Sequence, residues 1–193
     1  MNYAEALDLL ENGKAEKSKE FLRKNNYMLE YGYALLMLGK TDEAEEVFSG
    51  LDSHRADWIK KIISITKDKL NGYPTYFQIR SFLEIDISML LKSKQVDFVQ
   101  KLINYAQFFQ GINNESFKFF ARALLKNGLT IGCKHFMDKA LDEFYNDTEL
   151  HFLYVEYYLY LEDYDNAVKS LKKCLSINPE YYPALKMKKE LNL

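Results

Sequence analysis

Histidine and cysteine are the residues of this chain best suited to catalysis or metal binding, and they are few and scattered. The three histidines, His54, His135 and His151, fall in separate segments. Neither they nor the two cysteines stand at the short spacings typical of metal ligands. The sequence also lacks a glycine-rich phosphate loop and a G-x-S-x-G nucleophile motif. We therefore expect no cofactor, no metal and no catalysis. An enzyme or regulatory subunit whose site gathers distant residues remains an alternative.

A row of cations is the clearest chemical signal. Lys118, Arg122 and Lys126 stand at i, i+4 and i+8, which is one face of an α-helix. Such a row can hold a carboxylate, with the guanidinium of Arg122 binding it through two hydrogen bonds. The structural alternative is an ion pair with Glu156, which holds the slot of Arg122 one repeat later. The ion pair is the more ordinary explanation.

These residues belong to a pattern that recurs every 34 residues. Blocks that start at Arg80, Asn114 and Thr148 align without a gap. Their spacings of three, four and seven predict two amphipathic helices in each block, joined by a short turn. Such hairpins cannot bury their apolar faces alone, so they must stack. The slots filled by small or apolar side chains are Val99/Cys133/Ala167, Ala106/Ala140/Cys174, Ile103/Met137/Leu171, Ile87/Ala121/Val155 and Leu90/Leu124/Tyr158.

The block Thr148–Tyr181 resembles a tetratricopeptide repeat, and the segment around Gly39–Phe48 is similar to the same motif. Asp86, where an apolar residue is expected, and His151 depart from the pattern. The resemblance implies an all-α fold, a right-handed α–α superhelix of about five helical hairpins plus a C-terminal capping helix. The matching residues of the block are Tyr158, Tyr164, Ala167, Leu171, Cys174 and Pro179.

The whole chain, 1–193, is expected to form a single repeat domain. Residues 52–79 break the period, and there we expect a helix from about Arg55 to Leu70 with Ser53 as its cap. The alternating piece Leu83–Met89 fits a strand by period, but we predict a helix because a lone strand would leave its backbone groups unpaired. The segments are a degenerate repeat at 1–24, a repeat at 25–51, the irregular insert at 52–79, tandem repeats at 80–113, 114–147 and 148–181, and a capping helix at 182–193.

Two local features of the second repeat carry their own expectations. Thr41 is a good N-cap for the helix that follows it. Gly32 lies inside a helix, where glycine costs about 1 kcal/mol relative to alanine. We attribute it to close packing against the second helix of the repeat, near Ala44.

Composition narrows the class of partner. The formal net charge is −2, with 28% charged and 48% hydrophobic residues. No basic stripe or domain suggests nucleic acid. We expect neither a signal peptide nor a membrane-inserted helix, and a cytoplasmic protein. Cys133 and Cys174 occupy small packing slots in different repeats, so we expect buried thiols without a disulfide.

The resemblance also implies where a partner would bind, because first helices of similar proteins line a concave groove that holds peptides or partner helices. A clamp for chaperone tails is not expected, because its Lys and Asn positions are replaced here. Apolar anchors would be Leu29, Tyr33 and Phe152, with Lys118 and Arg122 fixing polar groups. The full set of groove residues is Leu29, Tyr33, Met37, Glu84, Lys118, Arg122, Lys126, Phe152, Glu156 and Tyr160.

The leading hypothesis is a non-catalytic scaffold or adaptor that binds a protein segment in this groove. A chaperone for secreted or assembly subunits is the runner-up. Four tyrosines cluster near the C-terminal end. Tyr158 and Tyr164 are expected in the core, while Tyr157 and Tyr160 would be free for partner contact or self-association through the Tyr-rich repeat.

Overall fold

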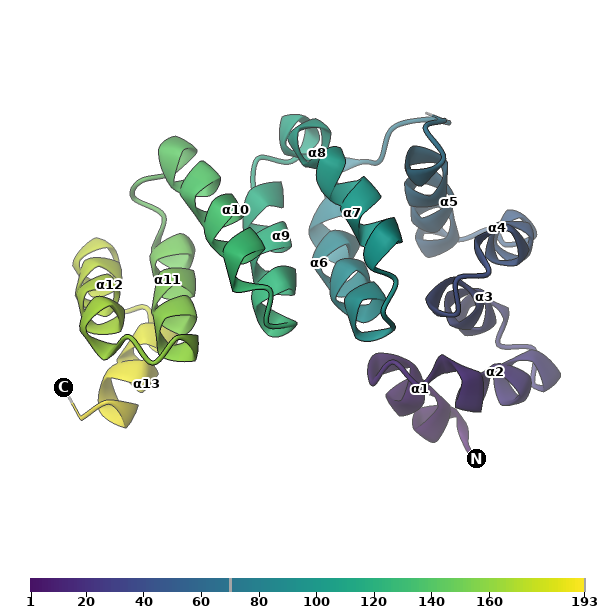
Figure 1. Ribbon diagram of the computed structural model, residues 1–193, viewed down its shortest axis with the longest axis horizontal. Coiled ribbons are helices and arrows are strands. Elements are labelled where there is room, and N and C mark those ends of the chain that lie inside the picture. Colours follow the sequence, from purple (N-terminus) through teal and green to yellow (C-terminus); the bar gives the residue numbers. More distant parts are fainter. Residues whose placement is uncertain (70, 193) are drawn as a thin grey trace. The chain divides into compact units, whose positions relative to one another are not determined.

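The computed structural model describes residues 1–69 and 71–192, which form thirteen α-helices and no strand (Figure 1). The all-α helical fold expected from the sequence is confirmed. The chain divides into two compact units, Met1–Ser116 and Phe117–Leu193. Among the described residues, no helix combines the length and apolar character needed to cross a bilayer.

The first unit is a series of short helices in which each of the first five packs on the next along the chain. Consecutive packing is what stacked helical hairpins require, since each hairpin buries its apolar face on its neighbour. The helices are α1 (Tyr3–Glu11), α2 (Ala15–Lys24), α3 (Met28–Met37), α4 (Thr41–Ser49), α5 (His54–Thr66), α6 (Tyr76–Lys92), α7 (Val96–Asn104) and α8 (Ala106–Ile112).

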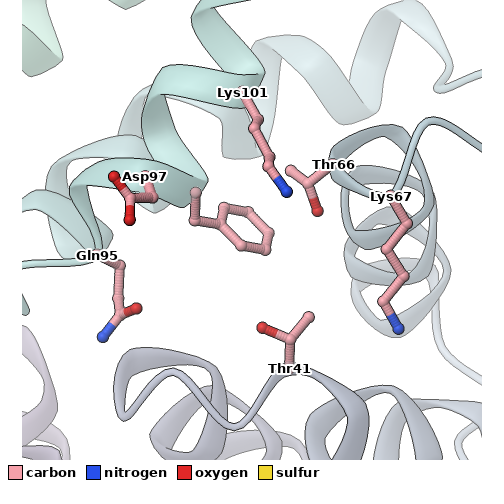
Figure 2. Close-up of a pocket in the computed structure, with 7 residues that line it drawn as sticks. Thr41, Thr66, Lys67, Gln95, Asp97 and Lys101 are labelled. Atoms are coloured by element: carbon pink, nitrogen blue, oxygen red, sulfur yellow. The ribbon is translucent and has the colours of Figure 1, made fainter.

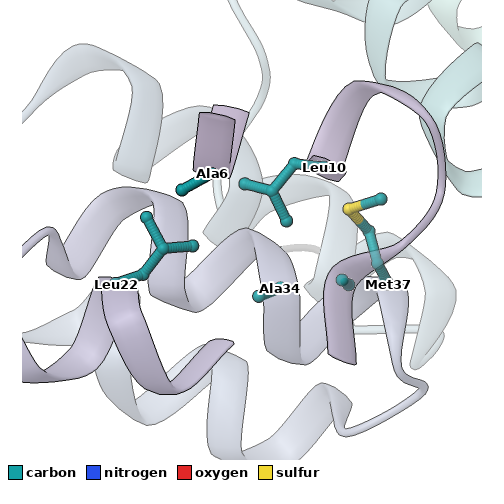
Figure 3. Close-up of a cluster of buried hydrophobic side chains, with 6 residues drawn as sticks. Ala6, Leu10, Leu22, Ala34 and Met37 are labelled. Carbon is teal, nitrogen blue, oxygen red and sulfur yellow. The ribbon is translucent and has the colours of Figure 1, made fainter. Parts of the chain in front are cut away.

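The core of the N-terminal helices consists of small and large apolar side chains that interlock. Ala6 and Leu10 of α1 meet Leu22 of α2, with Ala34 and Met37 of α3 beneath them (Figure 3). None of the five is more than 4% exposed. Alanine at the crossing points lets the helix backbones approach closely, and the larger side chains fill the space between them.

Gly32 is required by the packing of α3 on α4. A Cβ atom on Gly32 would lie 2.7 Å from Cζ of Phe48, a side chain that is fully buried. The expected close approach to the second helix is therefore confirmed, and the residue that enforces it is Phe48.

The helix starts follow the sequence in one case and differ in another. Ser53 caps α5 as predicted, since its side chain accepts a hydrogen bond from the amide of Ala56 at 3.1 Å. The prediction that Thr41 caps α4 is wrong. The carbonyl of Lys40 already accepts from the amide of Ala44, which makes Lys40 the cap and Thr41 the first helical residue.

The irregular insert contributes one helix, α5, to the first unit. Helix α5 ends at Thr66, and the expected end at Leu70 lies outside the described residues. The alternating piece Leu83–Met89 is helical, as predicted, within α6.

The second helix of the following block is interrupted, whereas one continuous helix was expected. At Tyr105 the amide turns to the carbonyl of Leu102, three residues back, and the tyrosine hydroxyl donates to Asp68 at 2.8 Å. Helix α7 therefore ends at Asn104 and α8 starts anew at Ala106.

The second unit is built from two helical hairpins and a final helix, with α9 starting at the boundary between the units. Helix α11 packs on both α10 and α12, and α13 packs on α12. The bounds are α9 (Ser116–Lys126), α10 (Thr130–Glu143), α11 (Thr148–Tyr160), α12 (Tyr164–Ile177) and α13 (Tyr182–Glu190).

The repeating small-residue slots are buried as predicted, with Ile103 and Tyr158 only half-buried. Cys133 and Cys174 are fully buried and free, which confirms their expected packing role. Burial raises the pKa of the Cys133 thiol to about 12 and that of Cys174 to about 11. Both thiols therefore stay protonated, and unreactive, at neutral pH.

Candidate partner-binding groove

A hollow of about 460 Å³ lies between helices α9 and α11 of the second unit. We call it the α9–α11 groove. Its volume falls within the range of roughly 300–1,000 Å³ that is typical of ligand pockets. The residues that line it are Arg122, Leu125, Lys126, Leu153, Glu156 and Tyr160. Four of the ten residues predicted for partner binding thus lie together.

The helical period explains how these side chains come to share one surface. Arg122 and Lys126 are one turn apart on α9, and Glu156 and Tyr160 are one turn apart on α11. Leu125 and Leu153 add apolar surface to the groove, and neither was among the residues predicted from the sequence. The groove therefore combines two cations, one anion and one phenol with an apolar lining.

Lys118 is part of the structure that supports the groove. Its side chain is only 2% exposed, and its Nζ atom lies 2.6 Å from a carboxylate oxygen of Asp147. Asp147 is also the N-cap of α11, accepting from the amide of Leu150 at 2.8 Å. Burial alone would raise the pKa of Asp147, but the hydrogen bonds from Lys118 and Leu150 outweigh it and lower that pKa. Lys118 thus lies in a structural ion pair, and its expected role as a groove cation is not supported.

Arg122 is partly engaged within the unit. Its guanidinium lies 3.7 Å from the carboxylate of Glu149 and 5.5 Å from the ring centroid of Phe119. The side chain is 25% exposed, so part of it still faces the groove. The sequence pattern suggested Glu156 as an ion-pair partner for this row of cations, and the structure also places Glu149 near the Arg122 guanidinium.

Tyr160 lines the groove, and its hydroxyl lies against Gly128 in the α9–α10 turn. A Cβ atom on Gly128 would lie 2.8 Å from the Tyr160 hydroxyl, and Gly128 has φ +74°. Glycine is needed there for both reasons. Tyr160 itself is 56% exposed, as a partner contact would require.

The other tyrosines differ in part from expectation. Tyr157 is buried although no core slot was assigned to it, and Tyr164, expected in the core, is 59% exposed. Tyr164 is the first residue of α12, one residue after the Asp163 cap.

Helices α11 and α12 together have the length, turn and buried small residues of one repeat unit. The family description "Tetratricopeptide repeat" matches residues 148–181, which span this pair. Residues 148–181 are a tetratricopeptide repeat. Repeats of this family generally mediate protein–protein interactions. No curated protein matches the chain, and no solved structure does.

The tetratricopeptide repeat supplies one wall of the groove through its first helix, α11. Phe152 lies on the same helix, half-buried, with its ring 5.7 Å from that of Tyr181. It therefore supports the start of α13 and is not among the residues that line the groove.

The residues of the first unit that were predicted to bind a partner are buried or half-buried. Tyr33 and Met37 are 6% and 2% exposed, and they belong to a continuous buried segment from Gly32 to Met37. Leu29 and Glu84 are half-buried. The burial of Tyr33 and Met37 makes them core residues, and the expectation that they face a partner is not supported.

Asp86 is a buried carboxylate with several partners. The sequence analysis noted it only as a polar residue at a position where the repeat pattern expects an apolar one. It is 1% exposed and accepts hydrogen bonds from Trp58 Nε1 at 2.6 Å and from Tyr33 at 3.4 Å. It also pairs with Arg55, whose guanidinium lies over the rings of Phe82 and Tyr33. The carboxylate thus joins α3, α5 and α6 of the first unit.

A second hollow, of about 280 Å³, lies in the first unit among α4, α5 and α7 (Figure 2). The Phe98 ring borders it. Lys67, one of its cations, already pairs with Asp42 and Glu45, each at 2.6 Å. The lining residues are Thr41, Thr66, Lys67, Gln95, Asp97, Phe98 and Lys101. In the part of the chain that the structure describes, no group of three or more His, Cys, Asp or Glu residues could hold a metal.

Proposed function

We propose that this chain is a non-catalytic scaffold that binds a segment of another protein in the α9–α11 groove. The observation that carries the proposal is the gathering of Arg122, Lys126, Glu156 and Tyr160 around an apolar lining, beside a tetratricopeptide repeat. An exposed tyrosine and an arginine are residue types enriched in the energetic centres of protein interfaces.

The charges of the groove favour a particular kind of segment. Cations lie on α9 and the anion on α11, so a bound segment would present acidic groups toward α9 and a donor toward Glu156. Leu125 and Leu153 would take an apolar side chain between them. Electrostatic complementarity of this kind sets the orientation and specificity of binding more than its strength.

The test uses a displayed library of random peptides, selected on the purified chain. Enriched peptides are then synthesised, and their Kd is measured by fluorescence anisotropy. Arg122→Ala, Lys126→Ala and Tyr160→Ala should each weaken binding. The variant with the largest effect should raise Kd by about tenfold or more.

Two variants serve as matched controls. Lys169→Ala removes an exposed lysine of α12, and Tyr145→Ala removes a tyrosine that is 70% exposed. Neither residue lines the groove, so both should leave Kd unchanged. If the selected peptides bind equally well to all groove variants, the α9–α11 groove is not the binding site.

A further inference from the structure

The final helix, α13, lies in the register of the first helix of another repeat. It begins at Tyr182, and the first helix of the tetratricopeptide repeat begins 34 residues earlier at Thr148. It packs on α12 and buries Ala184 against Leu171 and Cys174. Helices α12 and α13 therefore form a pair that can be compared, position by position, with α10 and α11.

A hollow of about 510 Å³ lies between α12 and α13, and we call it the α12–α13 groove. Leu171 and the half-buried Leu175 provide its apolar floor. Lys172, Ser176 and Lys188, all exposed, form its rim. The volume again falls in the range of roughly 300–1,000 Å³ that suits a ligand or a few side chains.

The comparison with the helix pair α10 and α11 shows what is unusual about the rim. Lys172 and Lys188 correspond to Asp138 and Tyr154, 34 residues earlier. In that helix pair the Tyr154 hydroxyl donates to the Asp138 carboxylate at 2.7 Å, and Tyr154 is buried. The later pair replaces an internal hydrogen bond by two cations on one groove. Among the described residues, the structure gives neither lysine an ion-pair partner.

The segment that surrounds the groove is also basic. Residues 168–192 contain six lysines and two acidic residues, whereas residues 117–167 contain five basic and nine acidic residues. A basic rim over an apolar floor, within an otherwise acidic unit, is complementary to an acidic and amphipathic ligand. Because the groove runs between two helices, a third helix fits it best, with its side chains placed between theirs.

We infer that the α12–α13 groove is a second docking site, which receives an acidic amphipathic helix of a partner protein. The apolar residues of that helix cover Leu171 and Leu175, and its acidic residues face Lys172 and Lys188. A second copy of this chain is a less suitable occupant. Its most acidic helix, α4, already buries its apolar residues Ala44 and Phe48 in its own core.

The probe is a labelled synthetic peptide of about 15 residues, near the shortest length at which an isolated helix forms. It carries leucine at i, i+4 and i+7 and glutamate on the flanking positions. One comparison peptide has the same composition in scrambled order, and another has lysine in place of glutamate. The acidic amphipathic peptide should bind the wild-type chain, as measured by fluorescence anisotropy, and the other two should bind at least about tenfold more weakly.

The variants place the peptide in the groove. Lys172→Glu combined with Lys188→Glu should reverse the preference in favour of the lysine peptide, and Leu175→Ser should weaken both. Lys169→Glu combined with Lys173→Glu makes the same charge change on exposed positions outside the groove and should keep the original preference. Circular dichroism confirms that each variant is folded.

Three results would overturn the inference. One is equal binding of the acidic, scrambled and lysine peptides. Another is binding that is lost in Arg122→Ala and Lys126→Ala but kept in the Lys172/Lys188 double variant, which would assign the peptide to the α9–α11 groove. The last is a wild-type dimer in sedimentation that Leu175→Ser dissociates, which would make the groove a contact between copies of this chain.

Discussion

The ammonium group of Lys118 and the carboxylate of Asp147 form a buried ion pair 2.6 Å apart, although 29 residues separate them in the sequence. Lys118 lies in the first turn of α9, and Asp147 caps α11. The Asp147 side chain therefore neutralises the charge of Lys118, caps α11 and holds α9 against α11. The α9–α11 groove lies between the same two helices.

Removing Lys118 should destabilise the fold. Lys118→Ala leaves the partly buried carboxylate of Asp147 without its cation, and breaking a buried pair from one side costs about 3–5 kcal/mol. Urea denaturation followed by circular dichroism measures the loss. Lys173→Ala, at an exposed position of α12, should change stability by no more than about 0.5 kcal/mol. Equal effects of the two variants would show that the ion pair contributes nothing.

Removing the Asp86 carboxylate should destabilise the first unit. Asp86→Ala takes away the acceptor of Trp58 and Tyr33 and the counter-ion of Arg55. A buried charge and two buried donors then lack partners, at a cost of about 3–5 kcal/mol. Trp58 is the only tryptophan, so its fluorescence reports on this site directly. A variant with wild-type stability and an unchanged emission maximum would contradict the prediction.

The same carboxylate should give stability a pH dependence of unusual sign. Burial raises the pKa of Asp86 to about 6, despite the opposing effect of Arg55. Between about pH 4 and pH 6 the folded chain holds a proton that the unfolded chain has released. The contribution of this group to stability therefore falls by about 3 kcal/mol as the pH rises through that window, and is level above it.

Asp86→Asn isolates this effect because it cannot titrate. Other carboxylates, such as Asp147 and Asp57, have lowered pKa values and lose their contribution as the pH falls. They are present in both proteins and cancel in the difference. The free energy of unfolding of the wild type minus that of Asp86→Asn should decline from pH 4 to pH 6. A difference that rises over this range would mean that Arg55 outweighs burial.

Adding one methyl group at Gly32 should destabilise the chain, while the same change at Gly111 should not. Gly32→Ala places a Cβ atom 2.7 Å from the buried ring of Phe48, and overpacking of this kind costs about 1–3 kcal/mol. Gly111 lies in α8 with nothing within 4 Å of its Cβ position. Gly111→Ala should be neutral or stabilise by up to about 1 kcal/mol. Thermal melts of both variants compare them, and a lower Tm for Gly111→Ala alone would contradict this account.

Much of the fold could be predicted because the helical period and the 34-residue repeat are set by the types of residues close together in the chain. The slots of Cys133, Ala140 and Ala167 were assigned from spacing and are buried. The cap at Ser53 followed from one residue type in front of a helix. The turn at Thr41 could not be predicted in the same way, since the geometry of the preceding αL residue Gly39 (φ +76°) decides which backbone group starts α4.

The sequence by itself determined that this chain is a helical repeat protein with buried thiols, and that a row of cations lies on one helix face. Only the tertiary structure decided that Lys118 is covered and paired with Asp147, and that Lys126 lines the α9–α11 groove. It also decided that Tyr33 and Met37 belong to the core and that Asp86 joins three helices. Periodicity fixes the face on which a side chain lies. Its burial and its partner depend on a helix brought against it from elsewhere in the chain.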